Sequence, residues 1–591
     1  MIKSSSTQQS VLVHTATGNT FADLPAHFFT RVPTTPLHSA RLLHVNQPLA
    51  LELGLSVNET QSPEFFAVVS GLQPMVGCKP LASVYSGHQF GVWAGQLGDG
   101  RAHYLGETTS PSGVFEWQLK GAGLTPYSRS ADGRAVLRSS VREYLASEAM
   151  HGLGIPTTRA LALVTSDDPV LRETIETAAI VTRLAPSFIR FGSFEHWASQ
   201  SHTEALKQLA DFVIERYYPE CLGQDGLSNH GRLDHFGDLA DQLASGGLGD
   251  QATKAVAGCR VSSADQKYNE FFKRVVQRTA KLIAQWQTVG FCHGVMNTDN
   301  MSILGLTIDY GPFGFMDGFD GRHICNHSDH SGRYAWYAQP SVAKWNLYCL
   351  ANSLSHLVSA TEGLSDALQT FDTVFTQNMH ARMMAKLGLE GEVEGDDALI
   401  DDLFKLMHEN KADFTLCFRE LAFISNVKNE SNSIVDSHVN ANQSTYDSTN
   451  HLVSADDALN MGWLPHEPLS KRPFYHLFAD VAATQAWANR YLKRVDMMYF
   501  GQDAKNQQLG EHDKQAKEAA RVQRMLSVNP LYVLRNHLAQ RAIEAAQKND
   551  ATELSNLLER LANPFVAKPG FELYAQPPSG LDQTISVSCS S

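Results

Sequence analysis

Residues 293–311 read HGVMNTDNMSILGLTIDYG, and this run carries more chemical information than any other part of the chain. Asn300 and Asp309 supply an amide oxygen and a carboxylate, and Asp309 also opens an Asp-x-Gly turn. Such donors suit Mg²⁺, which takes few protein ligands and completes its shell with phosphate oxygens and water. A plain polar loop between a helix and a strand would not need this combination. The run therefore predicts a loop that holds a divalent metal ion beside a phosphate.

The same run has the spacing of a kinase-like catalytic loop. Small-molecule kinases often contain His-Gly-Asp-x-x-x-x-Asn followed by a metal-binding Asp, and His293, Asn300 and Asp309 fit that order. Val295 occupies the position of the catalytic Asp and cannot accept a proton. The nearest carboxylate is Asp299, which precedes Asn300. The sequence therefore predicts a kinase-like site in which Val295 argues against ordinary kinase chemistry.

A lysine and a glutamate upstream are candidates for the same site. Lys120 ends a β-like run at 114–120, and Glu143 lies in a helix predicted over about 134–153, where apolar residues recur every four positions. A strand Lys held by a helix Glu is how protein kinases grip a nucleotide phosphate, although two such residues also occur as ordinary surface charges. The Gly- and Arg-rich segment between them contains Asp132 and Gly133, and we interpret it as a second phosphate-facing loop.

Two further features offer cations and backbone amides to a phosphate. The run GVWAGQLGDGR ends in Gly98, Gly100 and Arg101, and glycines at this spacing let backbone N–H groups approach an anion. The alternative interpretation of this run is a tight hairpin with an exposed Asp-Gly turn. Arg183 and Arg190 flank a proline and would clamp a polyphosphate, or would equally be surface charges with buried stems.

The composition describes an acidic globular protein. The 591 residues are 43% hydrophobic and 19% charged, which is enough apolar material for a core and too little charge for a disordered chain. The 48 Lys and Arg against 62 Asp and Glu give a formal charge of −14, which argues against a general nucleic-acid binder. Neither a membrane-spanning run nor a signal or mitochondrial-targeting pattern is present. We therefore expect a cytoplasmic protein that binds neither membranes nor nucleic acids.

The eight cysteines are scattered without a C-x-x-C pair, so neither a zinc ribbon nor a disulfide scaffold is indicated. The cluster Cys325-Asn-His327-Ser-Asp329-His330 raises the possibility of zinc, but it lacks a second pair of ligands at metal-finger spacing. Its position after Asp309 favours an activation-segment-like loop instead. Cys589 differs from the other cysteines because it lies in a small polar tail, where a role in the core is not expected.

The order of patterns predicts a small α+β part followed by a larger helical part. Helices are expected over residues 271–289, 341–358, 364–387, 399–421, 463–492 and 530–546. The expected units are an N-terminal extension packing on the core (1–75), a sheet-containing lobe with nucleotide-binding loops (76–200), a helical lobe with catalytic and metal-binding loops (201–425, with an insertion at about 223–260), a disordered insertion (426–455), and C-terminal helices with the Cys-containing tail (456–591).

Several strings together resemble the selenoprotein O family of pseudokinase protein adenylyltransferases, in its Cys-containing bacterial form. The matching strings are YSGHQFGVWAGQLGDGR (85–101), the blocks 120–148, 183–194 and 293–329, NPLYVLRN (529–536) and the terminal Cys589-Ser-Ser. The resemblance implies an α+β, protein-kinase-like fold with two lobes, a helix-rich C-terminal lobe and extra family-specific helices. It also implies ATP bound in an inverted orientation, with AMP transferred to Ser, Thr or Tyr hydroxyls of proteins and pyrophosphate released.

The resemblance further implies a role for each matching residue. Lys120 and Glu143 would form the phosphate-holding ion pair, Asn300 and Asp309 would hold Mg²⁺ or Mn²⁺, and Asp299 would be the base. The remaining residues of the implied nucleotide pocket are Gly98, Gly100, Arg101, Asp132, Gly133, Arg183 and Arg190. The family also suggests redox control through a disulfide between Cys589 and Cys325.

Three functions remain open at this point. The first is the nucleotidyl transferase, with ATP and possible use of UTP; the second is a kinase-like phosphotransferase using the same Mg–ATP site; the third is an inactive nucleotide-binding scaffold. The intact Lys120, Glu143, Asn300 and Asp309 argue against the scaffold, and Val295 argues against the phosphotransferase. The sequence does not indicate an oligomeric state or identify the protein substrates.

Overall fold

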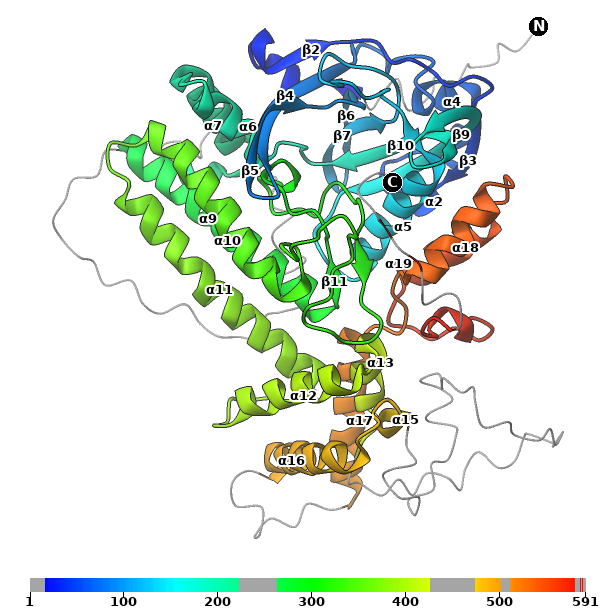
Figure 1. The fold of residues 1–591 in the computed structure, drawn as a ribbon, viewed down its shortest axis with the longest axis vertical. Coiled ribbons are helices and arrows are strands. Elements are labelled where there is room, and N and C mark those ends of the chain that lie inside the picture. The colour runs from blue at the N-terminus through cyan, green and yellow to red at the C-terminus, as the bar shows by residue number, and fades with distance from the viewer. Residues whose placement is uncertain are drawn as a thin grey trace, which may run out of the picture.

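The computed structural model describes residues 16–222, 263–425, 473–500 and 511–579, together with residues 585 and 587. The two expected insertions lie outside these ranges, and so does Cys589. The described chain combines one large sheet with many helices (Figure 1). The prediction of mixed α and β structure, with strands first and helices after, is therefore confirmed.

Ten strands of the described chain form one sheet in which every recorded pairing is antiparallel. The central order is β2-β4-β6-β7-β10-β9-β3, with β1 beside β6, β5 beside β4 and β8 beside β10. The strands are β1 (Ala16–Gly18), β2 (Phe29–Arg31), β3 (Arg41–Val45), β4 (Leu81–Gln89), β5 (Val92–Gly98), β6 (Ala102–Ser110), β7 (Gly113–Lys120), β8 (Ala135–Val136), β9 (Arg159–Leu171) and β10 (Ile175–Ala185). The sheet thus includes β1–β3, which come from the expected N-terminal extension.

The register between β7 and β10 brings two of the candidate cations to one face of the sheet. Lys120 is opposite Val181, and Gln118 is opposite Arg183. Side chains two residues apart on a strand share a face, so Lys120, Gln118 and Arg183 all lie on the same side. The two strands were recognisable from their alternating apolar residues, but this pairing joins residues that are far apart in the sequence.

The helices expected over about 134–153, 341–358 and 364–387 are found within a few residues of those bounds. The single helix expected over 463–492 is wrong, because in the described part of that range the chain is not helical between His476 and Val481. The helices of the described chain are α2 (Gln47–Glu52), α3 (Val57–Thr60), α4 (Pro63–Val69), α5 (Leu137–Gly152), α6 (Phe191–Ser199), α7 (Thr203–Tyr217), α9 (Ser263–Thr288), α10 (Gln339–Leu354), α11 (Glu362–Lys386), α12 (Asp396–Asn410), α13 (Phe414–Leu421), α15 (Pro473–His476), α16 (Val481–Phe500), α17 (Glu511–Val528), α18 (Asn536–Ala546) and α19 (Thr552–Ala562). A small two-stranded sheet consists of β11 (Phe291–Cys292) and β12 (Gly314–Phe315). Its two strands flank residues 293–311, the run that contains Asn300 and Asp309.

The single helix expected over residues 399–421 is wrong, because the chain breaks it into α12 and α13. Lys411 adopts a left-handed conformation with φ of 51°, which ends α12. The Asp413 side chain then accepts a hydrogen bond from the Leu416 N–H at 2.9 Å and caps the start of α13. The apolar pattern continues across the break because both helices bury the same side against one core.

Helix α5 lies between the sheet and the C-terminal helices α18 and α19 (Figure 1). Gly152 permits the close approach to α19, since a Cβ at this position would collide with the carbonyl oxygen of Leu561. The helix also carries Glu143, whose side chain is buried. Packing on both sides thus fixes the helix that holds one of the candidate site residues.

Three apolar clusters stabilise the described chain. One joins the inner side of the sheet to α5–α7, α9–α11, α18 and α19; a second lies among α12, α13 and α15–α17; the third packs α2–α4 on the other side of the sheet. The long helices α9, α10 and α11 lie side by side (Figure 1). None of the described helices is long and apolar enough to cross a membrane.

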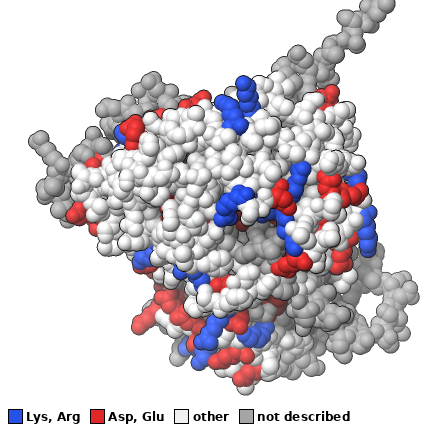
Figure 2. Space-filling model, turned by 45° about the horizontal axis from the view of Figure 1, so that its top comes forward, with Lys and Arg blue, Asp and Glu red and all other residues white. Residues whose placement is uncertain are grey.

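Charges of both signs are interspersed on the face drawn in Figure 2, with uncharged areas between them. The carboxylates are as prominent as the Lys and Arg side chains on this face, in keeping with the net charge of −14.

Candidate active site

A continuous network of buried ion pairs joins β7, α5, β10 and the loop after β11. Lys120 Nζ lies 2.6 Å from Glu143 Oε2, and Arg183 Nη1 lies 2.8 Å from Glu143 Oε1. Arg183 Nη1 also lies 2.6 Å from Asp309 Oδ1, while Arg190 pairs with the other carboxylate oxygen of Asp309. Five of the predicted site residues, from three separate stretches of sequence, therefore meet in one place.

The arginines and the lysine keep both carboxylates ionised. Burial alone would raise the pKa of Asp309, but Arg190, Arg183 and Lys120 outweigh it and hold that pKa well below its usual value. The pKa of Glu143 is likewise lowered, since Lys120 and Arg183 outweigh the effect of burial. Burial lowers the pKa of Lys120, although Glu143 opposes that shift. The alternative interpretation of Arg183 and Arg190 as surface charges is wrong, because both are 2% exposed.

Arg101 lies beside this network without an ion-pair partner among the described residues. Its guanidinium reaches the carbonyl oxygen of Arg134 at 3.5 Å. Burial lowers the pKa of Arg101, while the charges of Glu143 and Asp309 act to raise it. A half-buried cation next to a network of fixed charges is a candidate partner for an anionic ligand.

The glycine-rich run forms a hairpin strand and the turn that follows it. Residues 92–98 are strand β5, hairpin-paired with β4. Asp99 is 2% exposed and accepts a hydrogen bond from the Ser83 N–H at 2.9 Å, so the Asp-Gly turn is not exposed. A Cβ at Gly98 would collide with the Tyr127 ring, and one at Gly100 would lie 3.0 Å from the Tyr127 carbonyl oxygen. Both glycines thus have a packing reason beyond any contact with phosphate.

Asp132 and Gly133 lie on the rim of the region. Asp132 is exposed, pairs with Arg172 at 2.8 Å and accepts a hydrogen bond from the Arg134 N–H at 2.9 Å. A Cβ at Gly133 would collide with the backbone of Gly123, three residues after Lys120. These two residues therefore support the segment that follows β7, and the structure records no direct contact between them and the ion-pair network.

The run 293–311 forms two loops held together by its own side chains. His293 Nε2 lies 2.9 Å from the Ile308 carbonyl oxygen, which ties the start of the run to the residue before Asp309. Burial lowers the pKa of His293, which favours the neutral ring with its Nε2–H donating to this oxygen. Asn300 Nδ2 donates to the Val295 carbonyl oxygen at 3.0 Å, so its amide oxygen faces the other way. The motif spacing thus reflects real hydrogen bonds.

Asp299 lies between this loop and strand β4. The Gln89 amide donates to Asp299 Oδ2 at 3.2 Å, and Arg190 donates to the Asp299 carbonyl oxygen at 2.7 Å. Asp299 Oδ1 is buried and accepts no hydrogen bond from the described residues. Burial raises the pKa of Asp299 to about 6, with Gln89 and Arg190 opposing the rise. A carboxylate with a raised pKa and a free oxygen atom has the properties of a proton acceptor.

Sequence analysis missed several residues that shape this site. Gln89 reaches Asp299 from β4, and Gln118 accepts a hydrogen bond from Arg183. The Tyr85 ring lies under the Arg190 guanidinium at 4.9 Å from its centroid. No spacing rule could have found them, because each acts through a contact between distant segments. The only available signal was that Tyr85 and Gln89 fall within the string YSGHQFGVWAGQLGDGR.

The donor atoms fit a hard divalent ion such as Mg²⁺ or Mn²⁺. Asp309 is ionised, and each of its oxygens still has a lone pair beyond the one that an arginine occupies. Asn300 has its amide oxygen turned away from Val295, and the unpartnered Asp299 oxygen belongs to the neighbouring residue. An all-oxygen set of this kind suits these ions.

The loop with the Cys-His cluster is built around backbone hydrogen bonds. The Asp329 carboxylate accepts from the N–H groups of Arg333 at 3.0 Å and Tyr334 at 2.7 Å, so it is already used in shaping the loop. Cys325 is buried, with its Sγ 3.3 Å from the Cys292 carbonyl oxygen. The His327 N–H donates to the Val587 carbonyl oxygen at 3.1 Å, so the tail reaches this loop. Because Cys589 lies outside the described residues, the expected Cys325–Cys589 pairing stays a prediction.

Comparison with known proteins identifies the family. The family model described as "Protein adenylyltransferase SelO" matches residues 12–562. The chain is 51% identical over 574 residues to a protein nucleotidyltransferase YdiU of Bordetella avium, covering 97% of this chain and 98% of the relative. A protein of the same name from Paraburkholderia xenovorans is 45% identical over 591 residues, covering 98% and 96% respectively. The chain therefore belongs to the SelO family of protein nucleotidyltransferases.

Proposed function

We propose that this protein transfers AMP from ATP to Ser, Thr or Tyr hydroxyl groups of other proteins and releases pyrophosphate. The observation that carries the proposal is the buried network around Asp309, in which a kinase-like Lys–Glu pair meets two arginines that kinases do not need. The description of the matching family as adenylyltransferase supports the same reaction. The proposed architecture is kinase-like, with a sheet-containing lobe and a helical lobe on either side of this network.

The charge of the network matches a metal-bound triphosphate. Four cationic side chains and two ionised carboxylates leave an excess of two positive charges. These groups are Arg101, Lys120, Arg183, Arg190, Glu143 and Asp309. A fully ionised ATP carries about four negative charges, and one divalent ion reduces this to about two. The cations that now pair with Asp309 and Glu143 would then be shared with phosphate oxygens.

Each residue has a defined role in the proposal. Lys120, oriented by Glu143, and the pair Arg183 and Arg190 hold and neutralise the phosphates, including the departing pyrophosphate. Asn300 and Asp309 would hold Mg²⁺ or Mn²⁺, which when bound neutralises charge on the phosphate oxygens. Gly98, Gly100, Asp132 and Gly133 would shape the pocket wall through the packing described above.

Asp299 is the proposed base. Its Oδ1 has no hydrogen-bond partner among the described residues, so this atom is available to accept the proton of an incoming hydroxyl group. The backbone carbonyl of the same residue is fixed by Arg190, which also pairs with Asp309. The base and the phosphate-binding arginines are therefore held at a fixed relative position, which favours catalysis by positioning.

Two other functions compete with this proposal. The phosphotransferase would need a base at the position of Val295, and an apolar side chain cannot accept a proton. An inactive scaffold would have no chemical need for the ionised Asp309 together with the unpartnered Asp299 oxygen. The requirement for ATP favours the cytoplasm as the location of the reaction. The description of the matching family supports proteins as the acceptors, and hydroxyl groups as their reactive sites remain part of the proposal.

One labelling experiment separates the three functions. The protein would be incubated with Mg²⁺ or Mn²⁺ and with ATP labelled at either the α- or the γ-phosphate, and protein-bound label measured. We expect label from the α-position only. Label from the γ-position would instead establish the phosphotransferase, and no transfer with either label would establish the scaffold. UTP labelled at the α-position, run in parallel, tests whether uridylyl transfer also occurs.

Replacing the central carboxylate tests the site itself. The variant Asp309→Asn removes the charge that two arginines and the proposed metal share, so transfer should fall by at least about 100-fold. The fold should persist, because Arg183 remains ion-paired with Glu143 and Arg190 still donates a hydrogen bond to the Asp299 carbonyl oxygen. Asp402→Asn, which removes an exposed carboxylate paired with Arg490 on a distant helix, is the matched control and should keep full activity. Undiminished transfer by folded Asp309→Asn would remove the metal assignment.

A further inference from the structure

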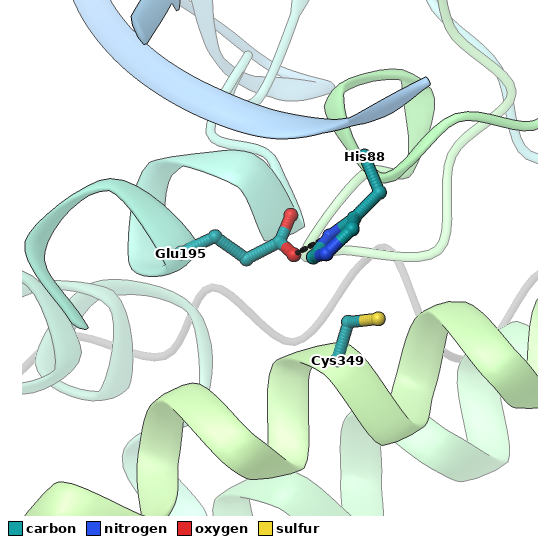
Figure 3. A group of neighbouring side chains, drawn as sticks. All are labelled: His88, Glu195 and Cys349. Carbon is teal, nitrogen blue, oxygen red and sulfur yellow. Dashed lines mark hydrogen bonds and ion pairs between the residues drawn. The ribbon is translucent and has the colours of Figure 1, made fainter. Parts of the chain in front are cut away.

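Three side chains that are potential metal ligands converge at one point beside the candidate active site. His88 comes from the end of β4, Glu195 from α6 and Cys349 from α10 (Figure 3). The donor atoms, a ring nitrogen, a carboxylate oxygen and the thiol sulfur, all lie within 4.8 Å of one another. His88 Nδ1 and Glu195 Oε1 are 2.6 Å apart. Each donor comes from a different element, so their meeting is a product of the tertiary fold.

The hydrogen bonding of Glu195 is incomplete. Its residue is 4% exposed, and its Oε2 accepts no hydrogen bond from the described residues. Burial raises the pKa of Glu195, while the Thr298 hydroxyl and His88 act to lower it. A buried carboxylate oxygen without a partner is costly, and a cation is one means of satisfying it.

The simpler interpretation is a His–Glu ion pair that braces β4 against α6. It accounts for His88 Nδ1 and Glu195 Oε1, but not for the unpartnered Oε2 or for the sulfur atom on the third side. Burial raises the pKa of the Cys349 thiol to about 12, with Glu195 adding to the rise and Arg333 opposing it. Without a cation the thiol is therefore neutral and contributes little to the pair.

We propose that His88, Glu195 and Cys349 bind a divalent transition-metal ion, with zinc as the best fit. Imidazole nitrogen, carboxylate oxygen and thiolate sulfur are all common zinc ligands, and sulfur disfavours Mg²⁺ and Ca²⁺. On binding, the Cys349 S–H bond breaks, a sulfur–zinc bond forms, and the proton leaves to solvent. His88 retains 25% side-chain exposure, which leaves room for water as the fourth ligand.

The geometry needs only a small contraction. Ligand atoms of tetrahedral zinc lie about 3.5 Å apart, given metal–ligand bonds of about 2.0 to 2.3 Å. Donors that already lie within 4.8 Å reach this separation by side-chain rotation of about an ångström, after which His88 exchanges its contact with Glu195 for the metal. Trp93 and Trp345 form walls around the imidazole, with ring centroids 5.0 and 5.3 Å from it. The Arg333 guanidinium lies over the Trp345 ring, 4.8 Å from its centroid. Its positive charge acts on Cys349 and would repel a bound metal ion.

The consequence of binding is mechanical. The His88 N–H donates to Thr298 Oγ1 at 2.8 Å, and the next residue of β4, Gln89, donates to Asp299. A metal ion at this point would cross-link the end of β4 to α6 and α10. This cross-link would lie beside the loop that contains Thr298 and Asp299. This role is separate from the proposed nucleotide-bound metal, which has only oxygen ligands.

Cobalt is a direct probe of the site, because a thiolate bound to Co²⁺ gives a near-ultraviolet charge-transfer band and tetrahedral Co²⁺ absorbs strongly in the visible. Full-length, metal-stripped, reduced protein would be titrated with Co²⁺, and Zn²⁺ added afterwards. We expect both absorptions to saturate at one equivalent and to disappear when zinc displaces cobalt. Zinc alone should also raise the thermal unfolding midpoint. Absence of the charge-transfer band would overturn the proposal.

Variants assign the band to these residues. Cys349→Ser should lose the charge-transfer band and the zinc-dependent stabilisation, and Glu195→Gln, close in shape to the native residue, should weaken cobalt binding at least tenfold. Cys221→Ser, which alters a buried cysteine outside this cluster, should keep the band. Asp309→Asn should also keep it, which separates this site from the proposed nucleotide site. A band that persists in folded Cys349→Ser, or unchanged affinity in Glu195→Gln, would contradict the assignment.

Discussion

Gly87 is a residue of strand β4 whose backbone lies against the proposed base. A Cβ at this position would lie 2.9 Å from Thr298 Oγ1 and 3.1 Å from Asp299 Oδ1. On the other side, a Cβ at Gly192 would lie 3.4 Å from the Asp299 Cα and would collide with the Ser86 carbonyl oxygen. Asp299 is thus held between two backbones that carry no side chain, and its position depends on both glycines.

The variant Gly87→Ala should therefore misplace the base without removing any functional group. The added methyl group must displace the Asp299 carboxylate or the strand by several tenths of an ångström, so we expect nucleotide transfer to fall about 10- to 100-fold. Nucleotide affinity, measured separately, should change little, because Lys120 and Arg183 are not displaced. Gly321→Ala is the control, since a Cβ there meets nothing within 4 Å. Equal activity of both variants would show that Asp299 does not need this placement.

Single residues also show where sequence reasoning succeeds and where it ends. His293, Asn300 and Asp309 were recognisable because one loop contains all three at a fixed spacing. Gln89 and Gly87 were not, because their role exists only once β4 lies against that loop, more than 200 residues later in the chain. Motif spacing therefore identifies residues that take part in the chemistry of a site. The residues that position them from distant segments become visible only in the folded structure.

At the scale of elements, apolar periodicity predicted α5, α9, α10 and α11, whereas α7, α17 and α19 were not predicted. Residues 364–387 were expected and α11 spans Glu362–Lys386, since core-facing apolar residues mark both ends. The error at 399–421 has a physical origin. Lys411 ends α12 in a left-handed conformation, which glycine usually adopts, so the residue type did not indicate the end of a helix. The strand order could not be predicted, because pairing of β9 with β3 joins segments more than 100 residues apart.

Strand β6 contains a buried histidine whose titration should be measurable. His103 is 0% exposed, and burial, with Arg134 adding to it and Pro33 opposing it, lowers the pKa of His103 to about 4. The folded state therefore favours the neutral ring. The neutral His103 ring thus allows the fold its full stability above the unfolded-state pKa of about 6.5. As the pH falls from there towards 4, the unfolded state gains a proton that the folded state does not, and the free energy of unfolding decreases.

The variant His103→Gln should reduce the acid sensitivity of the fold. Between pH 7.5 and 5.0, the free energy of unfolding of the wild type should decrease by about 2 kcal/mol more than that of the variant. Urea unfolding at the two pH values measures this difference, in which the other titrating groups cancel. His330→Gln, at an exposed position, should behave as the wild type does. The same pH dependence in His103→Gln and wild type would refute the assignment.

At the scale of the whole molecule, the stretch NPLYVLRN (529–536) joins parts of the structure that are distant in sequence. Arg535 is 1% exposed and pairs with Asp413 at 2.8 Å, with Asp317 and with the Ala575 carbonyl oxygen at 3.3 Å. The next residue, Asn536, accepts a hydrogen bond from Arg142 of α5 at 3.1 Å. The start of α18 is thereby tied to α13, to the loop after β12 and to the helix that carries Glu143.

Removing Arg535 should therefore lower the free energy of unfolding of the whole molecule. Arg535→Ala leaves the buried Asp413 and the half-buried Asp317 without their cation, and the breaking of a buried pair such as Arg535–Asp413 costs about 3 to 5 kcal/mol of unfolding free energy. Burial already raises the pKa of Asp317 against the opposing effect of Arg535, so without the arginine this carboxyl group should take up a proton more readily and the defect should be smaller at acidic pH. Thermal and urea unfolding at pH 7.5 and 5.5 measure both effects.

The matched control lies on α18, the helix that Arg535 directly precedes. Arg541 pairs with Glu553 at 2.9 Å, but its side chain is 46% exposed, so Arg541→Ala should cost less than about 1 kcal/mol. If Arg535 acts as a junction, its loss should lower the unfolding midpoint and the temperature at which nucleotide transfer is lost by the same amount, because α18 and α19 support α5 and Glu143. A midpoint shift without a matching loss of activity would mean that the C-terminal helices unfold independently of the site.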